Sequence, residues 1–238
     1  MAELGDRLKI IAGKIEKGET MADIGSDHGF LPVYLCENNI CQKVIVTDIS
    51  GASLQKARTA FSLYKGDAHV DFRVGDGLGP LSCGEVDTVV AAGMGGVTII
   101  KILKENALKT LSFGRYILHP RNGAGKLRFW LERAGFSLVS EDIVRERKFF
   151  CEIMTVKPPG NIIKPPYTGG YGGEIEYEIP RGLTSGSEEI FAQFINNKLN
   201  IEKNILQAMI NGNAADSEKI IGVKQRIGFL ERLVKEVV

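Results

Sequence analysis

Apolar residues recur every three or four positions in some segments of the chain and form short uninterrupted runs in others. Leu4, Leu8, Ile11 and Ile15 follow the helical period, which predicts an amphipathic helix at the start of the chain that ends at Gly18. The short apolar runs predict five strands, at residues 21–25, 43–49, 69–74, 87–92 and 115–120.

Three of the four segments between these strands, and the segment after the fifth strand, have the length and the punctuation of helices. They are a segment beginning near Pro32, residues 52–64 behind a Ser50 cap, residues 97–108, and residues 125–135 closed by Gly135. Strands that alternate with helices of this length predict a parallel sheet with helices on both faces.

Two further strands are predicted at residues 136–147 and 149–156, with no helix between them. Strands joined in this way pair antiparallel. The expected fold class is therefore α/β, and the order of elements resembles the Rossmann-like sheet of class I methyltransferases, which has an antiparallel terminal strand.

The composition changes after Val156. Residues 157–173 are dense in proline and glycine, and two long helical patterns follow at 187–211 and 216–238. A short connection favours a C-terminal helical hairpin with coiled-coil-like packing. We expect three parts: a cofactor-binding domain at 1–157, a linker at 158–186 and the hairpin at 187–238.

Composition is that of an ordinary globular protein, with 44% hydrophobic and 25% charged residues. No apolar run reaches the roughly 18 residues that a membrane-spanning helix needs. The first residues lack the features of a signal peptide, and the four cysteines lack metal-binding spacing. We therefore expect a cytoplasmic protein with no metal site and no membrane partner.

The charge is unevenly distributed although its net value is only +1. Residues 1–95 contain 9 Lys or Arg and 13 Asp or Glu, whereas residues 96–165 contain 13 and 6. The basic side chains after the fifth strand are Arg121, Lys126, Arg128, Arg133, Arg145, Arg147 and Lys148. This excess is typical of a surface that meets nucleic acid, although solvated helix faces would give the same count.

The turn after the first strand, residues 23–32, predicts the ligand site, because such sheets bind ligands at the carboxyl ends of their strands. A dinucleotide-binding loop requires the spacing G-x-G-x-x-G. Here Asp27 occupies the second glycine position and Phe30 the third. A carboxylate there would repel a pyrophosphate, which argues against a dehydrogenase.

S-adenosylmethionine has the opposite charge pattern, with a sulfonium, an ammonium and one carboxylate. Acidic strand ends would attract its cations, Asp48 could accept from the ribose hydroxyls, and Asp76 could accept from the adenine amino group. The expected cofactor-binding residues are Asp23, Gly25, Ser26, Asp27, His28, Asp48, Ile49, Gly75, Asp76, Gly77, Gly93 and Met94. Each strand-end Asp taken alone would equally suit a helix cap or a turn.

The loop DIGSDHGFLP, the segment AAGMGG at 91–96 and LRFWLERAGF together resemble the bacterial tRNA (adenine(22)-N1)-methyltransferases. The resemblance runs from about Leu4 to Val156. It implies a methyltransferase domain, S-adenosylmethionine as methyl donor, and a helical C-terminal domain that helps to hold tRNA. The chain differs from the family pattern at His119-Pro120-Arg121, where the family has Gln-Pro-Asn, and at Cys151-Glu152.

The reaction that this resemblance implies is direct methyl transfer to N1 of an adenine in tRNA. Asp27, His28 and His119 are the candidate catalytic residues, for orienting the base or receiving a proton. Two alternatives remain open: methylation of another RNA base or of a small molecule, and a non-catalytic S-adenosylmethionine-binding partner of RNA. The second is kept open by AAGMGG, which offers few reactive side chains.

Overall fold

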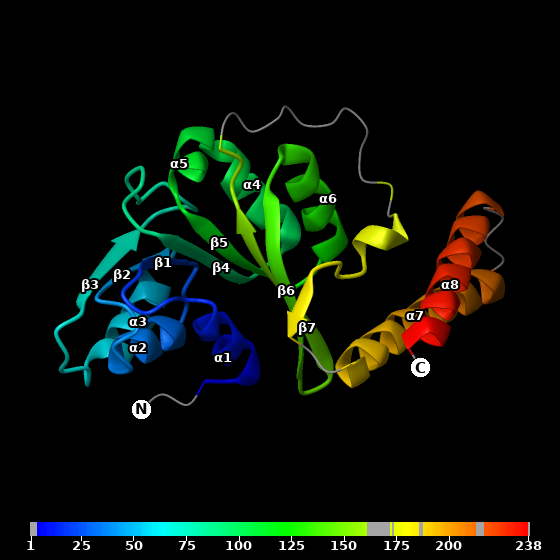
Figure 1. Ribbon diagram of the computed structural model, residues 1–238, viewed down its shortest axis with the longest axis horizontal. Helices are drawn as coiled ribbons and strands as arrows, with labels where there is room; N and C mark the ends of the chain where they lie inside the picture. Colours follow the sequence, from blue (N-terminus) through cyan, green and yellow to red (C-terminus); the bar gives the residue numbers. More distant parts are fainter. Residues whose placement is uncertain (1–3, 161–171, 173, 186–187, 213–216, 238) are drawn as a thin grey trace.

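The computed structural model describes residues 4–160, 172, 174–185, 188–212 and 217–237. Within them, a mixed sheet has the strand order β3-β2-β1-β4-β5-β7-β6-β8 (Figure 1). In chain order, the strands are β1 (Thr20–Ile24), β2 (Lys43–Asp48), β3 (His69–Val74), β4 (Thr88–Met94), β5 (Arg115–Pro120), β6 (Ser137–Glu146), β7 (Phe149–Lys157) and β8 (Leu183–Ser185).

Helices separate the first five strands everywhere except between β3 and β4, as the sequence pattern predicted. They are α1 (Asp6–Gly13), α2 (Phe30–Glu37), α3 (Gly51–Phe61), α4 (Gly96–Glu105), α5 (Ala107–Ser112) and α6 (Ala124–Ala134). The 3-10 helix η1 (Ile175–Tyr177) follows β7, and the long helices α7 (Glu188–Asn211) and α8 (Ser217–Val237) follow β8.

The strands β1 to β5 are parallel, and β7 is antiparallel to both of its neighbours, β5 and β6. Both features confirm the predicted Rossmann-like sheet with an antiparallel terminal strand. β7 follows β6 in the chain but lies between β5 and β6 in the sheet. All the parallel strands therefore present their carboxyl ends at one edge, followed by loops that can form a site.

Each face of the sheet is covered by its own hydrophobic core. Ile11 of α1 and Leu35 of α2 are fully buried on one face. Ile99 of α4 and Leu127 of α6 are fully buried on the other. Figure 1 shows α1, α2 and α3 on one side of the strands and α4, α5 and α6 on the other. Helices on both faces explain why the central strands are apolar without alternation.

Several elements differ from the predictions. The first helix ends at Gly13, not at Gly18. The predicted helix 97–108 is divided at Asn106, whose side chain accepts from the Lys109 amide (3.1 Å) and caps α5. In the segment predicted to be a linker, residues 174–185 contain η1 and β8, whereas residues 161–171 lie outside the described residues. β8 is held against β6 by the Glu141 amide, which donates to the Gly182 carbonyl (2.7 Å).

The C-terminal helices α7 and α8 form the predicted hairpin beside the β6–β7 end of the sheet (Figure 1). Phe194 and Leu230 are buried between the helices and pack with Ile143 of β6. Glu202, which interrupts the apolar pattern of α7, binds Arg226 of α8 (3.0 Å). The hairpin is thus fixed to the sheet through a small third core.

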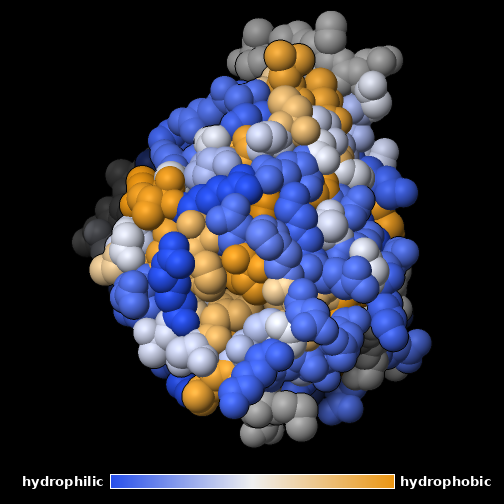
Figure 2. All heavy atoms as spheres, turned by 90° about the vertical axis from the view of Figure 1, so that its left-hand side faces the viewer, coloured by the Kyte–Doolittle hydropathy of each residue, from blue (hydrophilic) through white to orange (hydrophobic). Residues whose placement is uncertain are grey.

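The opposite end of the molecule is the edge of the sheet at β3. Figure 2 shows this side as mostly hydrophilic, with apolar groups visible near its middle. Val70 and Phe72 of β3 are only half-buried, although they pack against the core beneath α2 and α3. No helix in the described part of the chain is long and apolar enough to cross a membrane.

Candidate active site

The loop from Gly25 to Gly29 connects β1 to α2 and lies at the carboxyl edge of the sheet. The amides of Gly25 and Ser26 both donate to the Thr47 carbonyl of β2 (2.9 and 3.1 Å). Gly29 has φ +70°, and a Cβ there would lie 2.9 Å from the Cβ of Ala57. Glycine at this position therefore allows α2 to begin directly against α3.

Asp23 is a buried carboxylate at the end of β1. It accepts a hydrogen bond from the Ser26 hydroxyl (2.6 Å). Burial raises the pKa of Asp23 to about 6; the Ser26 hydrogen bond and Arg7 oppose this rise, while Asp48 adds to it. A cation placed beside Asp23 would favour its ionised form, so this position suits a positively charged ligand group.

Asp48 ends β2 and supports the same loop. One oxygen accepts from the Ser50 amide (2.8 Å) and the other lies 3.4 Å from the Asp27 amide nitrogen. The Ser50 hydroxyl accepts from the Ser53 amide (3.3 Å), which confirms the predicted cap of α3. Asp48 is therefore held in place between two backbone donors.

Asp27 and His28 lie on the exposed side of this loop. The Asp27 carboxylate contacts Lys56 Nζ (3.2 Å) and His28 Nε2 (3.4 Å). The His28 ring stacks on Phe30, with 5.3 Å between ring centroids. Asp27 has φ +48°, a left-handed conformation that Asp tolerates better than most residues.

A cavity of about 300 Å³ lies against this loop. Its lining includes six of the predicted cofactor-binding residues: Asp23, Gly25, Ser26, Asp27, His28 and Gly93. We refer to it as the cofactor cavity.

The other six predicted cofactor-binding residues are at neighbouring strand ends: Asp48, Ile49, Gly75, Asp76, Gly77 and Met94. The Gly75 amide donates to the Asp48 carbonyl (3.0 Å), and Met94 Cε lies 3.1 Å from where a Cβ of Gly25 would be. Ile49 is 70% exposed, and Asp76 is exposed with Lys101 at 3.9 Å. None of these six residues is among those that line the cofactor cavity.

A β-bulge interrupts the pairing of β4 with β5. Ala92 pairs with His119 and Met94 pairs with Pro120, which leaves Gly93 as the extra residue. The Gly93 amide donates to Nδ1 of His119 (3.0 Å). Burial, with help from Arg7 and Arg121, lowers the pKa of His119 to about 4. A neutral ring whose Nδ1 lone pair is already occupied is poorly suited to receive a proton.

A second cavity, of about 440 Å³, adjoins the cofactor cavity and shares Arg7 and Gly93 with it. Because it is the candidate site for a methyl acceptor, we refer to it as the substrate cavity. Its remaining lining residues are His119, Pro120, Arg121, Glu146, Phe149, Phe150 and Cys151. His119 therefore faces the substrate cavity, whereas Asp27 and His28 line the cofactor cavity. The three predicted catalytic residues are not brought together.

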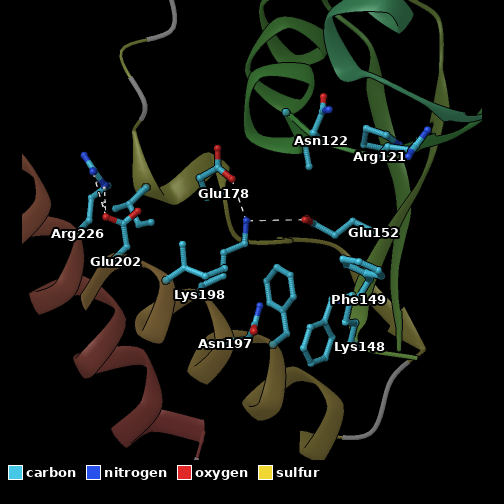
Figure 3. A pocket seen from close by; sticks show the side chains of 17 residues that line it. Arg121, Asn122, Lys148, Phe149, Glu152, Glu178, Asn197, Lys198, Glu202 and Arg226 are labelled. Carbon is cyan, nitrogen blue, oxygen red and sulfur yellow. Dashed lines mark hydrogen bonds and ion pairs between the residues drawn. The ribbon is translucent and has the colours of Figure 1, made fainter. Parts of the chain in front are cut away.

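A third cavity, of about 690 Å³, lies between the sheet and the hairpin (Figure 3). It shares Pro120, Arg121, Phe149 and Phe150 with the substrate cavity, so all three cavities are linked by shared walls. We refer to it as the interdomain cavity. Lys198 of α7 enters it between Glu178 (2.9 Å) and Glu152 (3.9 Å), as Figure 3 shows.

Arg128 corrects the prediction of one basic surface after β5. It is only 7% exposed and donates to Glu141 and Glu152 (2.6 Å each) and to the Tyr177 carbonyl (3.0 Å). Burial opposes ionisation of a guanidinium, but these two carboxylates raise the pKa of Arg128 overall. The side chain joins α6 to β6, β7 and η1 and is removed from any RNA surface. Arg121, Lys126, Arg145, Arg147 and Lys148 are exposed.

Arg7 and Glu146 are site residues that the sequence did not predict. They come from α1 and β6, are 139 positions apart and form an ion pair (3.5 Å). The only sequence signal for Arg7 was its place on the polar side of the first amphipathic helix. In the described part of the chain, no group of three or more His, Cys, Asp or Glu side chains could hold a metal ion.

The fold and the loop at the end of β1 define a class of protein. Residues 4–154 match the methyltransferase domain family. This match covers more than half of the chain, so the chain belongs to that family.

The curated relatives include the tRNA (adenine(22)-N(1))-methyltransferase of Bacillus subtilis strain 168. It is 35% identical over 155 residues, and the match covers 65% of this chain and 65% of the relative. The chain thus spans just under two thirds of that enzyme's length.

Solved structures extend the similarity to the C-terminal helices. The B. subtilis M1A22 tRNA methyltransferase TrmK is 28% identical with a TM-score of 0.74, covering 100% of this chain and 98% of the other. M. capricolum TrmK in complex with S-adenosyl-homocysteine is 21% identical with a TM-score of 0.75, covering 99% of each chain. This second likeness establishes the fold alone.

Proposed function

We propose that this protein transfers a methyl group from S-adenosylmethionine to N1 of an adenine in tRNA, at adenosine 22. The observation that carries the proposal is the meeting of the cofactor cavity and the substrate cavity at Gly93. The similarity to the B. subtilis enzyme supports the choice of base and position.

The residues of the cofactor cavity fit S-adenosylmethionine, which supplies an activated methyl group when bound. Asp23 offers a carboxylate to its ammonium, and Asp48 is the candidate acceptor for the ribose hydroxyls. At Gly93, a Cβ would meet no atom of the described residues within 4 Å. The backbone there borders open space, which leaves room for a methyl donor and an acceptor to approach each other.

The substrate cavity fits a flat base that has been turned out of its stack. Phe149 is 64% exposed, so its ring is available to stack on such a base. The N1 lone pair of adenine is unprotonated at neutral pH, and no strong base is needed to create the nucleophile. The chain's contribution is to hold the two reacting groups in line, which accounts for large rate effects without acid–base chemistry.

The interdomain cavity and the exposed cations near it suit the rest of an RNA substrate. Arg121 and Lys148 are exposed on its walls. Lys198 and Arg226 are paired there with Glu178 and Glu202, as Figure 3 shows. Cations near the substrate cavity can neutralise phosphates that flank the methylated base. A tRNA substrate also implies that the protein works in the cytoplasm.

The proposal is tested by incubating the protein with unmodified tRNA and labelled S-adenosylmethionine, followed by nucleoside mapping. We expect 1-methyladenosine at position 22. A control transcript in which guanosine replaces adenosine 22 should remain unlabelled. Label on another base, or on a small molecule only, would move the activity to a different substrate. Binding of cofactor and tRNA without transfer would indicate the non-catalytic RNA partner.

A further inference from the structure

The bulge at Gly93 needs an external restraint, because Gly93 has no paired residue on β5. Gly93 has φ +81°, in the left-handed region that glycine enters freely. The same freedom lets a glycine leave that conformation readily. Bulges beside active sites commonly direct the backbone or a side chain toward a ligand.

The restraint present in the structure is the ring of His119. Its Nδ1 accepts the Gly93 N–H at 3.0 Å, and the residue is only 4% exposed. In a neutral imidazole with Nδ1 as acceptor, the proton is on Nε2. A buried ring has few alternative orientations, so this acceptor stays where the bulge requires it.

The position of Gly93 gives the contact a consequence for chemistry. Gly93 lines both the cofactor cavity and the substrate cavity, and His119 lines the substrate cavity only. A rotation of the peptide before Gly93 would therefore change the boundary across which a methyl group passes. Small errors in such alignment are costly, since a shift of about 1 Å can reduce a rate about 100-fold.

We infer that His119 is a positioning residue for methyl transfer: by accepting the Gly93 N–H it fixes the bulged backbone at the boundary of the two cavities. The inference rests on the proposed function. It assigns His119 no proton to move and no direct role in binding S-adenosylmethionine.

The variants His119→Asn and His119→Gln distinguish the contact between Nδ1 and Gly93 from any contact that Nε2 makes. His119→Asn places an amide oxygen near the position of Nδ1 and keeps an acceptor for Gly93. His119→Gln is longer by one bond and places its amide near the position of Nε2. His119→Ala removes both groups.

We expect His119→Ala to lower kcat for methylation of a tRNA transcript by about 10- to 100-fold. The KM for tRNA and the affinity for S-adenosylhomocysteine should change less than threefold. His119→Asn should recover most of the lost kcat, and His119→Gln should not. Amide exchange at Gly93 in ¹⁵N-glycine-labelled protein should be faster in His119→Ala than in wild type and slow again in His119→Asn.

Three results would overturn the inference. They are an unchanged kcat in His119→Ala, recovery by Gln but not by Asn, and Gly93 exchange that does not respond to the Ala variant. The exchange measurement requires only folded protein, so reduced activity caused by poor folding is recognised. Wild-type protein that transfers no methyl group to the transcript would refute the proposed function and this inference with it. Active wild type with an equally active His119→Ala would refute the inference alone.

Discussion

Arg128 of α6 and Glu152 of β7 form an ion pair inside the protein, with 2.6 Å between Nη2 and Oε2. Lys198 of α7 lies 3.9 Å from the other oxygen of Glu152. One carboxylate thus connects a helix of the methyltransferase domain with the C-terminal hairpin at the wall of the interdomain cavity. Arg128 also donates to Glu141, whose second oxygen accepts from the Arg181 amide (2.7 Å).

Replacing Arg128 by Ala should destabilise the protein by about 3–5 kcal/mol, because two buried carboxylates would lose their cation. Urea unfolding followed by circular dichroism measures this loss. Lys126→Ala, an exposed change two positions away, is the matched control and should stay within about 0.5 kcal/mol of wild type. Equal stabilities for the two variants would show that the network contributes nothing.

Replacing Arg121 and Lys148 together by Ala should weaken tRNA binding and reduce its dependence on salt. The slope of log K against log salt is negative, and each phosphate contact that is lost should make it less negative by about 1. Filter binding at several salt concentrations measures both quantities. Lys17→Ala with Lys65→Ala, two exposed lysines of the acidic part of the chain, should leave the slope unchanged. A wild-type slope in Arg121→Ala/Lys148→Ala would place the RNA surface elsewhere.

Asp48→Asn should weaken S-adenosylhomocysteine binding by about 1–3 kcal/mol, because the ribose hydroxyls would lose a charged acceptor. The Asn side chain keeps an oxygen for the Ser50 amide, so the loop should stay folded. Isothermal calorimetry gives the affinity, with the exposed Asp67→Asn as control. Wild-type affinity in Asp48→Asn would remove this residue from the site.

The raised pKa of Asp23 predicts proton release when the cofactor binds. The pKa is about 6 in the folded protein against 3.8 for the free side chain, so ligand-free protein retains a proton on Asp23 near pH 5 to 6. This retained proton stabilises the fold below pH 4, and the contribution is lost as the pH rises through 6. An ammonium beside Asp23 would favour ionisation and expel the proton.

Calorimetry in buffers of different ionisation enthalpy detects that release. We expect proton release on cofactor binding at pH 6 in the wild-type protein and little release at pH 8. In Asp23→Asn, this site should release no proton. Equal proton release in wild type and Asp23→Asn at pH 6 would mean that the ammonium does not lie beside Asp23.

Ending the chain after residue 186 should leave a protein that folds and binds cofactor, because both large cores of the sheet lie in residues 4–156. Ile143 would lose its packing against Phe194 and Leu230, so the melting temperature should fall. Methylation of tRNA should fall more steeply than cofactor affinity, since six of the 17 residues that line the interdomain cavity would be missing. Unchanged methylation would restrict the hairpin to a structural role.

The sheet could be predicted because its central strands are short apolar runs and its helices have clear boundaries. Ser50 at the start of α3 is one such boundary, and its capping bond is present. β8 could not be predicted, because three residues behind a proline- and glycine-rich stretch are too few to show a period. Its pairing depends on Glu141, which lies about 40 positions earlier in the chain.

The positions of candidate site residues could be predicted where a strand end determines them, but not where segments distant in the sequence meet. Asp23 and Gly25 could be placed from the turn that contains them. Arg7 depends on how α1 packs beside β6, which no local pattern encodes. Arg128 was misassigned because a charged residue on a helix is usually exposed, whereas α6 is covered on more than one side and buries it against Glu141.

The position of β7 between β5 and β6 imposes an order on the assembly of the chain during synthesis. Among the described strands, β6 has neighbours only in β7 and β8, so it cannot join the sheet until the chain has been made through residue 157. The strands and loops that line the cofactor cavity are complete by Met94, whereas Phe149 and Cys151 of the substrate cavity lie on the inserted strand. A growing chain therefore acquires its donor side before its acceptor side, and β5 keeps an unpaired edge until β7 emerges.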